Sequence, residues 1–583
     1  MLSKVIIAQT TLSSFLSDKE SDKGSDKLSR HDVLSGCDIV HFNDGFINRE
    51  ALKRVANQLT HFSESTTTNQ SQNQSQEPSQ DRVKLAISLR PTEQDIAVYD
   101  HSINHNKSAL AVVKLSEYIS RVIDLVDYIE LDAQCDLISP ILELIPPHKR
   151  MITRRLSLDT NGSAEQLLEQ YQSDCTMAQA WLYRLICNDS LSALEFLHQI
   201  DPTNTSTNTN TNTSTNTSTN TSTNTSNSTD NAIGNVIAYD PREDELWSRI
   251  CASYKGAPVI FTTTDSDTRV SLAWLNKNYN LAALPASINK LYGIIGASIS
   301  HSFSPLVHNK GLQALQLPAV YLPFNIADMA KLKNHTQRMS AIGLPISGLT
   351  VTAPLKDCVN SAYHTHREIM DCVNSANVLM LNEGYLVAET TDDYGLRKVL
   401  NQQQLAVKGK QVAIIGCGCS GRIAAYTLAE MGAQVTLYNR SPERGAMAER
   451  LLKLPCKPLQ DLILSDFDLL VNTVPFASAA DITFPPSQFN PKSTYIDFVY
   501  NPYPNALLVQ ANLSEATVID GLSMLEQQLH GQFSCLTNQD LPPQAELALA
   551  AILSARRKVA VRSDEPVKVR EQRAIHPRLQ KVS

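Results

Sequence analysis

Residues 296–309, GASISHSFSPLVHN, gather serine and histidine side chains among glycine, proline and small apolar residues. Neither a helical nor a strand period is visible in this stretch. An unpaired buried polar group costs about 1 to 3 kcal/mol, so a buried loop of this composition needs partners for its hydroxyl and imidazole groups. A ligand rich in oxygen atoms supplies such partners. The segment is therefore a candidate ligand-binding loop.

A glycine-rich stretch, GCGCSG at 416–421, is a second candidate site. Gly416 permits a tight turn, Gly418 lets the backbone approach a pyrophosphate, and Gly421 allows a helix to pack closely on a strand. The first residues of the helix that follows then face the anion with unpaired N–H groups. The pattern predicts a dinucleotide-binding loop.

The elements expected around this loop support the same interpretation. Strand-forming residues Val412–Ile415 precede it, a helical pattern runs to Gly432, and a second strand is expected over Val435–Tyr438. A G-x-G-x-x-G motif is weak when it stands alone, whereas one inside a complete strand–helix–strand unit is specific. We therefore expect a Rossmann domain here.

The end of the second strand indicates which dinucleotide is bound. A cofactor with a free ribose 2′-hydroxyl usually meets an acidic residue at this place. The sequence instead supplies Asn439, Arg440 and Ser441, with Arg444 shortly after them. Arginine forms charge-assisted hydrogen bonds with phosphate, so a 2′-phosphate fits this segment better. NADP is favoured over NAD.

The whole chain has 583 residues, 42% of them hydrophobic, and a formal charge of -8. This length predicts about three to five domains, and the charge gives no reason to expect a nucleic-acid partner. A signal peptide and a run of about 18 apolar residues are both missing, so we expect a cytoplasmic protein without a membrane partner. The 11 cysteines form no C-x-x-C pair, which indicates reduced thiols and no metal site.

The expected elements divide the chain into a barrel-like first half and two further α/β domains. Short strand-like runs alternate with helical patterns over residues 1–285, which favours a (β/α)8-barrel. Low-complexity stretches near 63–80 and 203–231 are expected to be disordered inserts. The second half is expected to contain a substrate-binding α/β domain (290–405, completed by helices near 520–555), a Rossmann domain (406–519) and a solvated basic tail (557–583).

Six motifs of the second half occur in the order found in shikimate dehydrogenases. They are GASISHSFSPLVHN, GLTVTAPLK, SANVL, ETTDDYG, the GCGCSG…YNRS unit and IDGLSMLEQQLHGQF. Residues from about 290 to 555 therefore resemble this family. The resemblance implies two α/β domains with the substrate in the cleft, and a reversible reduction of 3-dehydroshikimate to shikimate with NADPH.

The resemblance also assigns roles to single residues. Lys356 and Asp392 correspond to the family's catalytic pair, and Ser302 and Ser304 to the residues that hold the substrate carboxylate. Reduction of a ketone leaves an alkoxide, so a lysine can supply both the nearby cation and the proton. The implied substrate contacts are Thr352, Asn377, Tyr500 and Gln528, and the implied cofactor contacts are Gly416, Gly418, Cys419, Ser420, Gly421, Asn439, Arg440, Arg444, Gly521 and Met524. The histidines of the serine loop, His301 and His308, are expected to be structural.

The sequence departs from the family pattern at a few positions. Ala388 and Thr390 stand where the family usually has glycine and asparagine, and Asn374 stands where glycine is usual. The segment NTVPF at 472–476 lacks the usual serine and glycine of the cofactor-side loop. None of these changes removes the proton donor or the serines.

The first half resembles the type I 3-dehydroquinate dehydratase that precedes shikimate dehydrogenase in bifunctional enzymes. The resemblance rests on ISLRP, which contains Arg90, on VDYIEL, and on TRVSL, which contains Arg269. That family forms an imine between its substrate and a lysine. In CDIVHFNDGF, however, His41, Asn43 and Gly45 replace its glutamate, arginine and aspartate.

The catalytic residues of the dehydratase also have no counterpart in the alignment. It places Leu156 at the catalytic histidine and Leu182 near the imine-forming lysine. In a different register of the alignment, Lys84 or Lys149 would take the place of that lysine. Without an amine no imine forms, and without the base no proton is removed. We expect a barrel that has kept its fold and lost dehydratase activity.

The sequence therefore favours an NADP-dependent shikimate dehydrogenase behind a degenerate dehydratase-like domain, with 3-dehydroshikimate or shikimate as its small-molecule partner. Two alternatives stay open. One is a quinate or shikimate dehydrogenase that uses NAD, and the other is a non-catalytic sensor of metabolites of the shikimate pathway. The sequence does not indicate the oligomeric state.

Overall fold

The computed structural model divides the chain into two compact units, which we describe one at a time. Unit 1 comprises residues 1–288 and 337–344, and unit 2 comprises residues 289–336 and 345–583. None of the described helices is long and apolar enough to cross a membrane. The residues that the structure describes are 5–10, 37–42, 47–67, 83–89, 109–158, 163–201, 235–265, 268–297, 299–358, 364–365, 367–382, 385–474, 484 and 488–562.

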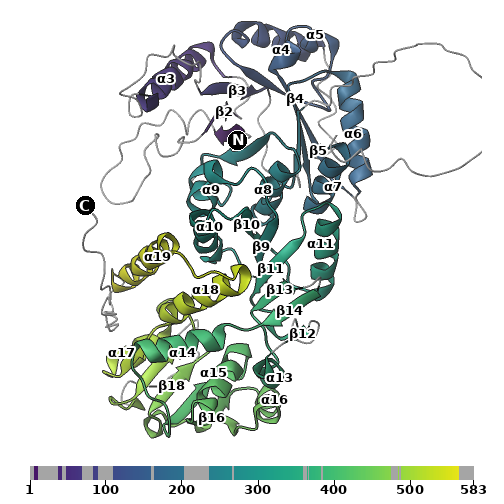
Figure 1. Cartoon of the computed structure of the whole chain (residues 1–583). Helices are drawn as coiled ribbons and strands as arrows, with labels where there is room; N and C mark the ends of the chain where they lie inside the picture. The colour runs from purple at the N-terminus through teal and green to yellow at the C-terminus, as the bar shows by residue number, and fades with distance from the viewer. Residues whose placement is uncertain are drawn as a thin grey trace, which may run out of the picture. The chain divides into compact units, whose positions relative to one another are not determined.

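Unit 1 is built on one eight-stranded parallel sheet, drawn from purple to teal in Figure 1. Its strand order is β7-β6-β5-β4-β3-β2-β1-β8, the order that a (β/α)8-barrel requires. Among the pairs that the described residues form, none joins β7 to β8, so closure of the sheet is not seen. The strands are β1 (Val5–Thr10), β2 (Ile39–Phe42), β3 (Lys84–Ser88), β4 (Tyr128–Asp132), β5 (Arg150–Leu156), β6 (Leu182–Cys187), β7 (Asn235–Tyr239) and β8 (Val259–Thr263).

This sheet curves back on itself. Arg184 on β6 donates a hydrogen bond from Nη2 to Oε1 of Gln9 on β1, 3.2 Å away, although four strands separate β6 from β1 in the sheet. Every residue of β6 is buried, as expected of a strand covered on both faces. The helices of unit 1 are α3 (Arg49–Thr67), α4 (Ala109–Val122), α5 (Ser139–Leu142), α6 (Ala164–Met177), α7 (Ser190–Ile200), α8 (Leu246–Tyr254) and α9 (Leu272–Tyr279).

The predicted low-complexity inserts fall largely outside the described residues. Helix α3 continues to Thr67 and thus includes the first residues of the stretch near 63–80. The remainder of that stretch and the whole of 203–231 are not described, and neither are Arg90, Asn43 and Gly45. The predictions made for these residues stay predictions.

Unit 2 contains two separate six-stranded sheets, and the first is mixed. Its order is β10-β9-β11-β13-β14-β12, with parallel pairing except where β13 runs antiparallel to β11 and β14. Its strands are β9 (Lys290–Ile295), β10 (Ala319–Phe324), β11 (Ile346–Val351), β12 (His364–Thr365), β13 (Val378–Asn382) and β14 (Tyr385–Glu389). Its helices are α10 (Ser304–Ala314), α11 (Met329–Ala341), which ends in unit 1, α13 (Glu368–Val373) and α14 (Asp392–Gln402).

The second sheet of unit 2 is parallel throughout and confirms the predicted Rossmann fold. Its order, β17-β16-β15-β18-β19-β20, reverses direction between β15 and β18, where dinucleotides bind in such sheets. Its strands are β15 (Gln411–Ile415), β16 (Gln434–Asn439), β17 (Cys456–Pro458), β18 (Leu469–Asn472), β19 (Thr494–Asp497) and β20 (Thr517–Ile519). Its helices are α15 (Cys419–Glu430), α16 (Pro442–Leu452) and α17 (Ala506–Leu513).

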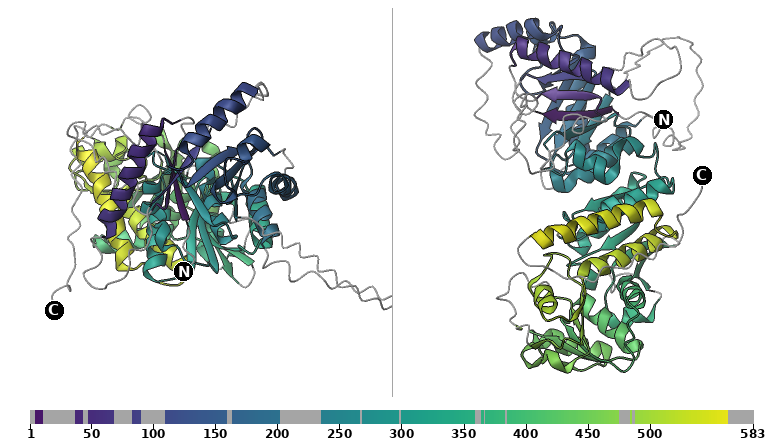
Figure 2. Two further views of the ribbon diagram at one scale, coloured as in Figure 1. Left: turned by 90° about the horizontal axis from the view of Figure 1, so that it is seen from above. Right: turned by 90° about the vertical axis from the view of Figure 1, so that its left-hand side faces the viewer.

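Two helices near the end of the chain, yellow in Figure 2, return to the first sheet of unit 2. They are α18 (Gly521–Thr537) and α19 (Pro543–Arg562), and both contact α10. The side chains of Leu529 and Phe533 on α18 are fully buried in the core there. Arg557 on α19 pairs with the buried Asp520, with Nε to Oδ2 at 2.9 Å. The basic tail therefore does not begin at 557 as expected, because a buried carboxylate at the start of α18 requires this arginine.

Candidate active site

Lys356 and Asp392, predicted to be the catalytic pair, lie in direct contact. Lys356 follows the end of β11 and Asp392 is the first residue of α14, and Nζ lies 2.9 Å from Oδ2. Asp392 is fully buried and Lys356 is 18% exposed. Burial of Lys356 opposes its charge, but the facing Asp392 carboxylate outweighs burial and raises the pKa of Lys356. The lysine is therefore an ammonium at neutral pH, held by the aspartate.

Asn377 fixes the carboxylate of Asp392 from the other side. Its Nδ2 donates to Oγ1 of Thr391 at 3.0 Å and to Oδ1 of Asp392 at 2.5 Å, and its Oδ1 accepts from the backbone N–H of Thr391 at 2.9 Å. Both N–H bonds of this buried amide are thus already used. The structure places Asn377 as a support for Asp392, while its predicted contact with a substrate hydroxyl stays a prediction.

The predicted serine loop lies beside the segment that leads to Lys356. The backbone N–H of Ala297 donates to the carbonyl of Ala353 at 3.0 Å, and a Cβ at Gly296 would overlap the side chain of Thr352. Ser302 accepts at Oγ from the backbone N–H of Ser304, 3.2 Å away. Both hydroxyls stand at the first turn of α10, where unpaired N–H groups favour an anion.

The two histidines of this loop differ in position. His308 is buried, donates from Nδ1 to the carbonyl of Ser304 at 2.9 Å, and stacks on Tyr321 with 4.3 Å between ring centroids. Burial lowers the pKa of His308 to about 4, so the ring is neutral at pH 7. His301 is exposed. His308 therefore supports the loop from within the core, as expected, rather than acting as an acid or base.

The later predicted residues lie on α18 and on the segment that follows β19. Tyr500 is half-buried, and burial raises the pKa of its hydroxyl. The charge of Lys356 lowers this pKa and the charge of Asp392 raises it. Gln528 is half-buried and faces α14, because its Cγ lies 3.3 Å from where a Cβ of Gly395 would stand. Met524 packs in the core of the Rossmann sheet and is only 1% exposed. A side chain at Gly521 would overlap the carbonyl of Val499.

A cavity of about 430 Å³ lies over the glycine loop at the switch point of the Rossmann sheet. Gly416 has φ +105°, and a Cβ at Gly421 would overlap the carbonyl oxygen of Gly416, so both must be glycine. A Cβ at Gly418 would meet nothing within 4 Å, which leaves open space beside the backbone. The lining residues are Ala353, Ile415, Gly416, Cys417, Gly418, Tyr438, Asn439, Arg440, Ser441, Arg444, Leu459, Thr473 and Val474.

The predicted phosphate-binding arginines line the same cavity. Arg440 and Arg444 are exposed, and within the described part of the chain their guanidinium groups have no hydrogen-bond partner. Ser441 caps α16 by accepting from the backbone N–H of Arg444 at 3.3 Å. Asn439 accepts at Oδ1 from the N–H of Cys417 and donates from Nδ2 to the carbonyl of Ser441. The loop is thus fixed while two cations are left for an anionic ligand.

Two supporting residues, Arg367 and Arg422, were not predicted from the sequence. Arg367 donates to the carbonyl of Thr390 at 3.1 Å and pairs with Asp393, and so holds the turn before α14. Arg422 on α15 is buried and contacts Asp357, the residue after Lys356. A charged residue on a helix whose neighbours are apolar is a usable signal for Arg422. The contacts of Arg367 join strand, turn and helix, and no local pattern records them.

Unit 1 also contains a buried polar cluster, which we call the strand cluster: His41, Glu130 and Arg184 with Gln9, Ser88, Thr153 and Tyr239. Nη1 of Arg184 lies 3.1 Å from Oε1 of Glu130, and Nε2 of His41 lies 3.4 Å from Oε2. Burial lowers the pKa of His41 to about 4. Burial of Glu130 is outweighed by His41 and Arg184, so its pKa falls to about 2.

The register of the strands separates the two leucines that were expected at dehydratase positions. Leu156 ends β5 and pairs with Cys187, whereas Leu182 begins β6 and pairs with Met151. In a parallel sheet these two leucines therefore lie at opposite edges, so they do not mark one site. The β6 residue that enters the strand cluster is Arg184.

The alternative lysines lie away from the strand cluster. Lys84 begins β3 and donates from Nζ to the hydroxyl of Tyr128 at 3.3 Å. Lys149 precedes β5 and donates to the carbonyls of Ile123 and Val126, both at 2.8 Å. Within the described residues, no lysine amine enters the strand cluster. Arg269, a further expected match, pairs with Glu243 at 3.4 Å and with Asp244.

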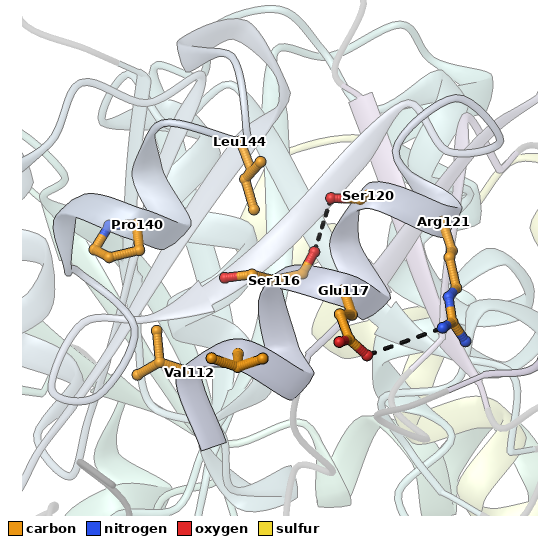
Figure 3. A pocket seen from close by; sticks show the side chains of 8 residues that line it. Val112, Ser116, Glu117, Ser120, Arg121, Pro140 and Leu144 are labelled. Atoms are coloured by element: carbon orange, nitrogen blue, oxygen red, sulfur yellow. Dashed lines mark hydrogen bonds and ion pairs between the residues drawn. The ribbon is translucent and has the colours of Figure 1, made fainter. Parts of the chain in front are cut away.

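A further hollow in unit 1, between α4 and α5, has no such convergence of groups (Figure 3). Val112, Pro140 and Leu144 form much of its wall. Its charged residues, Glu117 and Arg121, pair with each other on α4 at 3.9 Å instead of pointing together at a ligand. The described residues also hold no group of side chains that could bind a metal ion. The site around Lys356 is therefore the stronger candidate.

Comparison with known proteins identifies relatives of the second half of the chain. Residues 294–379 match the shikimate dehydrogenase substrate binding domain family. The shikimate dehydrogenase (NADP(+)) of Pyrococcus abyssi is 32% identical over 263 residues, which are 44% of this chain and 95% of that protein. That of Oleidesulfovibrio alaskensis is 31% identical over 279 residues, 47% of this chain and 99% of that protein. A solved structure of shikimate dehydrogenase from Aquifex aeolicus is 25% identical, with a TM-score of 0.41, and the match covers 45% of this chain and 97% of that one.

Proposed function

The chain belongs to the shikimate dehydrogenase family, and on this premise we propose that its second half reversibly reduces 3-dehydroshikimate to shikimate with NADPH. It is an oxidoreductase of the shikimate dehydrogenase (NADP(+)) class. The observation that carries the proposal is the ion pair of Lys356 and Asp392, 2.9 Å apart. Ala353, three residues before the lysine, lines the cavity of the glycine loop, so proton donor and cofactor cavity adjoin.

The residues of the cavity fit NADP. Open space at Gly418 admits a pyrophosphate to the first turn of α15, and Arg440 and Arg444 are free to bind a 2′-phosphate. The bound cofactor supplies the hydride. The first turn of α15 has no acidic residue that would oppose the pyrophosphate charge.

The reaction needs a proton for the oxygen of the ketone as that oxygen gains charge. Lys356 is an ammonium that can donate this proton, and before donation its charge stabilises the developing alkoxide. Asp392 holds the ammonium, and Asn377 holds Asp392, so the donor stays aimed without a change of rotamer. Ser302 and Ser304 at the start of α10 are proposed to bind the substrate carboxylate, with Thr352, Tyr500 and Gln528 contacting the ring hydroxyls.

For unit 1 we propose a dehydratase-like barrel that has lost its activity. The strand cluster supports this, because the residue that β6 contributes to it is Arg184. A guanidinium group cannot form an imine. The acids and bases of the cluster are bonded to one another, and none of them has an amine beside it in the described part of the chain.

The proposal is tested by measuring NADPH oxidation with 3-dehydroshikimate. Lys356→Ala is expected to lower turnover by about 100-fold or more with little change in NADPH affinity, since general acids contribute factors of this size. Lys398→Ala on α14 is the matched control, because that exposed lysine lies over Tyr394 and contacts no site residue. Equal turnover of wild type and Lys356→Ala would reject the role of the lysine.

Two further measurements decide the open alternatives. Parallel assays with shikimate or quinate, and with NADP+ or NAD+, separate the proposed enzyme from an NAD-dependent quinate dehydrogenase. Absence of turnover with every pair, together with binding of shikimate, would instead establish a metabolite sensor. For unit 1, borohydride treatment with 3-dehydroquinate is expected to trap no adduct, and a trapped adduct would refute the loss of activity.

A further inference from the structure

Arg422 is a buried cation that the proposed reaction does not use. It is the fourth residue of α15, just after the last glycine of the loop, and its side chain is only 2% exposed. It is the largest fully buried side chain in the described part of the chain. A guanidinium in such a place must find acceptors for its N–H groups and a counter-charge.

The acceptors of Arg422 come from three separate segments. Nη1 donates to the carbonyl of Cys417 in the glycine loop at 3.1 Å. Nε donates to the carbonyl of Val373 at 2.7 Å, and Nη2 to that of Asn374 at 3.2 Å, where α13 ends. Nη2 also bonds Oδ1 of Asp357. Asp357 is the only carboxylate that pairs with Arg422 among the described residues.

Two of these segments are the ones that hold the catalytic lysine. Asp357 follows Lys356 in the chain. The segment after Asn374 returns to the same lysine, because the backbone N–H of Ala376 donates to the carbonyl of Lys356 at 3.0 Å. The next residue, Asn377, binds Asp392. The side chain of Arg422 thus joins the cofactor loop to two segments that hold Lys356: Asp357, its neighbour in the chain, and the segment from Asn374 to Ala376.

We propose that Arg422 and Asp357 are a positioning pair that fixes Lys356 relative to the dinucleotide loop. The inference rests on the proposed function of the site. Neither residue reaches the reacting atoms in this account. Loss of the pair displaces the donor, and small displacements of a catalytic group lower turnover more than they weaken ligand binding.

Asp357→Asn is the main test, because Asp357 is 49% exposed and the amide keeps its shape without the charge. We expect kcat to fall by about tenfold while the KM values for NADPH and 3-dehydroshikimate change by less than about threefold. Arg422→Lys keeps the charge but not the fork of donors, and is expected to retain more activity than Arg422→Gln. Asp357→Asn combined with Arg422→Lys is expected to be no slower than the slower single variant, since both disrupt one unit.

The matched control is Glu430→Gln. It breaks the ion pair of Arg397 on α14 with Glu430 on α15, which joins the helix of Arg422 to the helix of Asp392 without contacting a site residue. Its kcat is expected to stay at the wild-type value. If Asp357→Asn matches the control in kcat, or if it lowers thermal stability and all kinetic constants together, the positioning role is refuted.

A readout that needs no turnover separates this inference from the proposed function. Acetylation of Lys356 by acetic anhydride, followed by mass spectrometry, reports how the amine is held. In the wild type we expect NADP+ to slow the labelling of Lys356 by about threefold or more, and in Asp357→Asn by less than half as much, because the loop is uncoupled from the lysine. An inactive wild type would reject the proposed function, and the labelling would still decide the pair. The same response to NADP+ in both proteins would overturn it.

Discussion

The strand cluster of unit 1 lies within a parallel sheet and the lysine site of unit 2 lies beyond the ends of its strands, and the two also differ in how far their polar groups are already bonded. In the strand cluster, His41, Glu130 and Arg184 are each no more than 5% exposed and bond one another. At the lysine site, Lys356 is 18% exposed, and the adjoining cavity is lined by two arginines whose guanidinium groups have no partner among the described residues. A cluster whose bonds are complete supports its fold, whereas one with bonds to spare can accept a ligand.

The difference is sharpest for the two buried carboxylates, and replacing Asp392 is expected to have the largest effect. Asp392→Asn removes the charge that holds Lys356, so the ammonium is neither fixed nor favoured. We expect turnover to fall by about 1000-fold, within the range typical of acid–base groups, with the free energy of unfolding changed by less than about 1 kcal/mol. Steady-state kinetics and urea unfolding of the same samples measure both quantities. Full activity in Asp392→Asn would remove the contrast between the two clusters.

Glu130→Gln is the reciprocal change in unit 1. It leaves Arg184 without a counter-charge in a buried place, and breaking such a pair typically costs about 3 to 5 kcal/mol. All three tryptophans, Trp181, Trp247 and Trp274, are in unit 1, so tryptophan fluorescence during urea unfolding reports on this unit. We expect a loss of about 3 kcal/mol of unfolding free energy by this probe, and wild-type NADPH oxidation. A drop in turnover at unchanged stability would show that the strand cluster is not structural.

The unpaired arginines provide the next test. Arg440→Ala combined with Arg444→Ala removes both cations of the cavity and no side-chain bond to another described residue. We expect the KM for NADPH to rise by about 30-fold and that for NADH to change by less than about twofold, because only NADPH carries the 2′-phosphate. Kinetics with both cofactors measure this. Equal effects on the two would place the 2′-phosphate elsewhere.

The smallest expected effect concerns pH. The pKa of His41 is lowered from 6.5 to about 4, so the stability it contributes is complete above pH 6.5 and is lost as the pH falls toward 4. Between pH 7 and 5 we expect the wild type to lose about 1 to 2 kcal/mol more than His41→Gln in unit 1, followed by tryptophan fluorescence. His308→Gln is the control, because His308 has the same lowered pKa but belongs to unit 2. A wild-type pH response in His41→Gln would exclude this histidine as its cause.

The Rossmann sheet was predictable because its loop is specified by backbone geometry. Gly416 and Gly421 are required by a positive φ and by a close approach, and glycine is the residue that satisfies both. The family resemblance supplied the pair of Lys356 and Asp392, which no local pattern connects. Asn374, which replaces the usual glycine, has φ +47° and ends α13, and asparagine tolerates this conformation better than most residues.

The parts that sequence did not predict depend on register and on contacts between distant segments. Every residue of β6 is buried, so its sequence has no alternation to show which side chains face the strand cluster. The sequence therefore did not single out Arg184 as the β6 residue of the strand cluster. The bonds of Arg422 and Asn377 join residues that are far apart in the chain, and spacing along a sequence does not reveal them.

Gly395 sits one turn after Asp392, where α14 contacts α18, and Gln528 fills the space that a side chain there would need. The predicted substrate contact Gln528 is thus held close against the helix that begins with Asp392. A methyl group at this crossing would lie 3.3 Å from Cγ of Gln528, so the glutamine would have to shift by a few tenths of an ångström to admit it. Under the proposed function, Gly395→Ala would therefore move a proposed substrate contact while leaving the proposed proton donor itself unaltered.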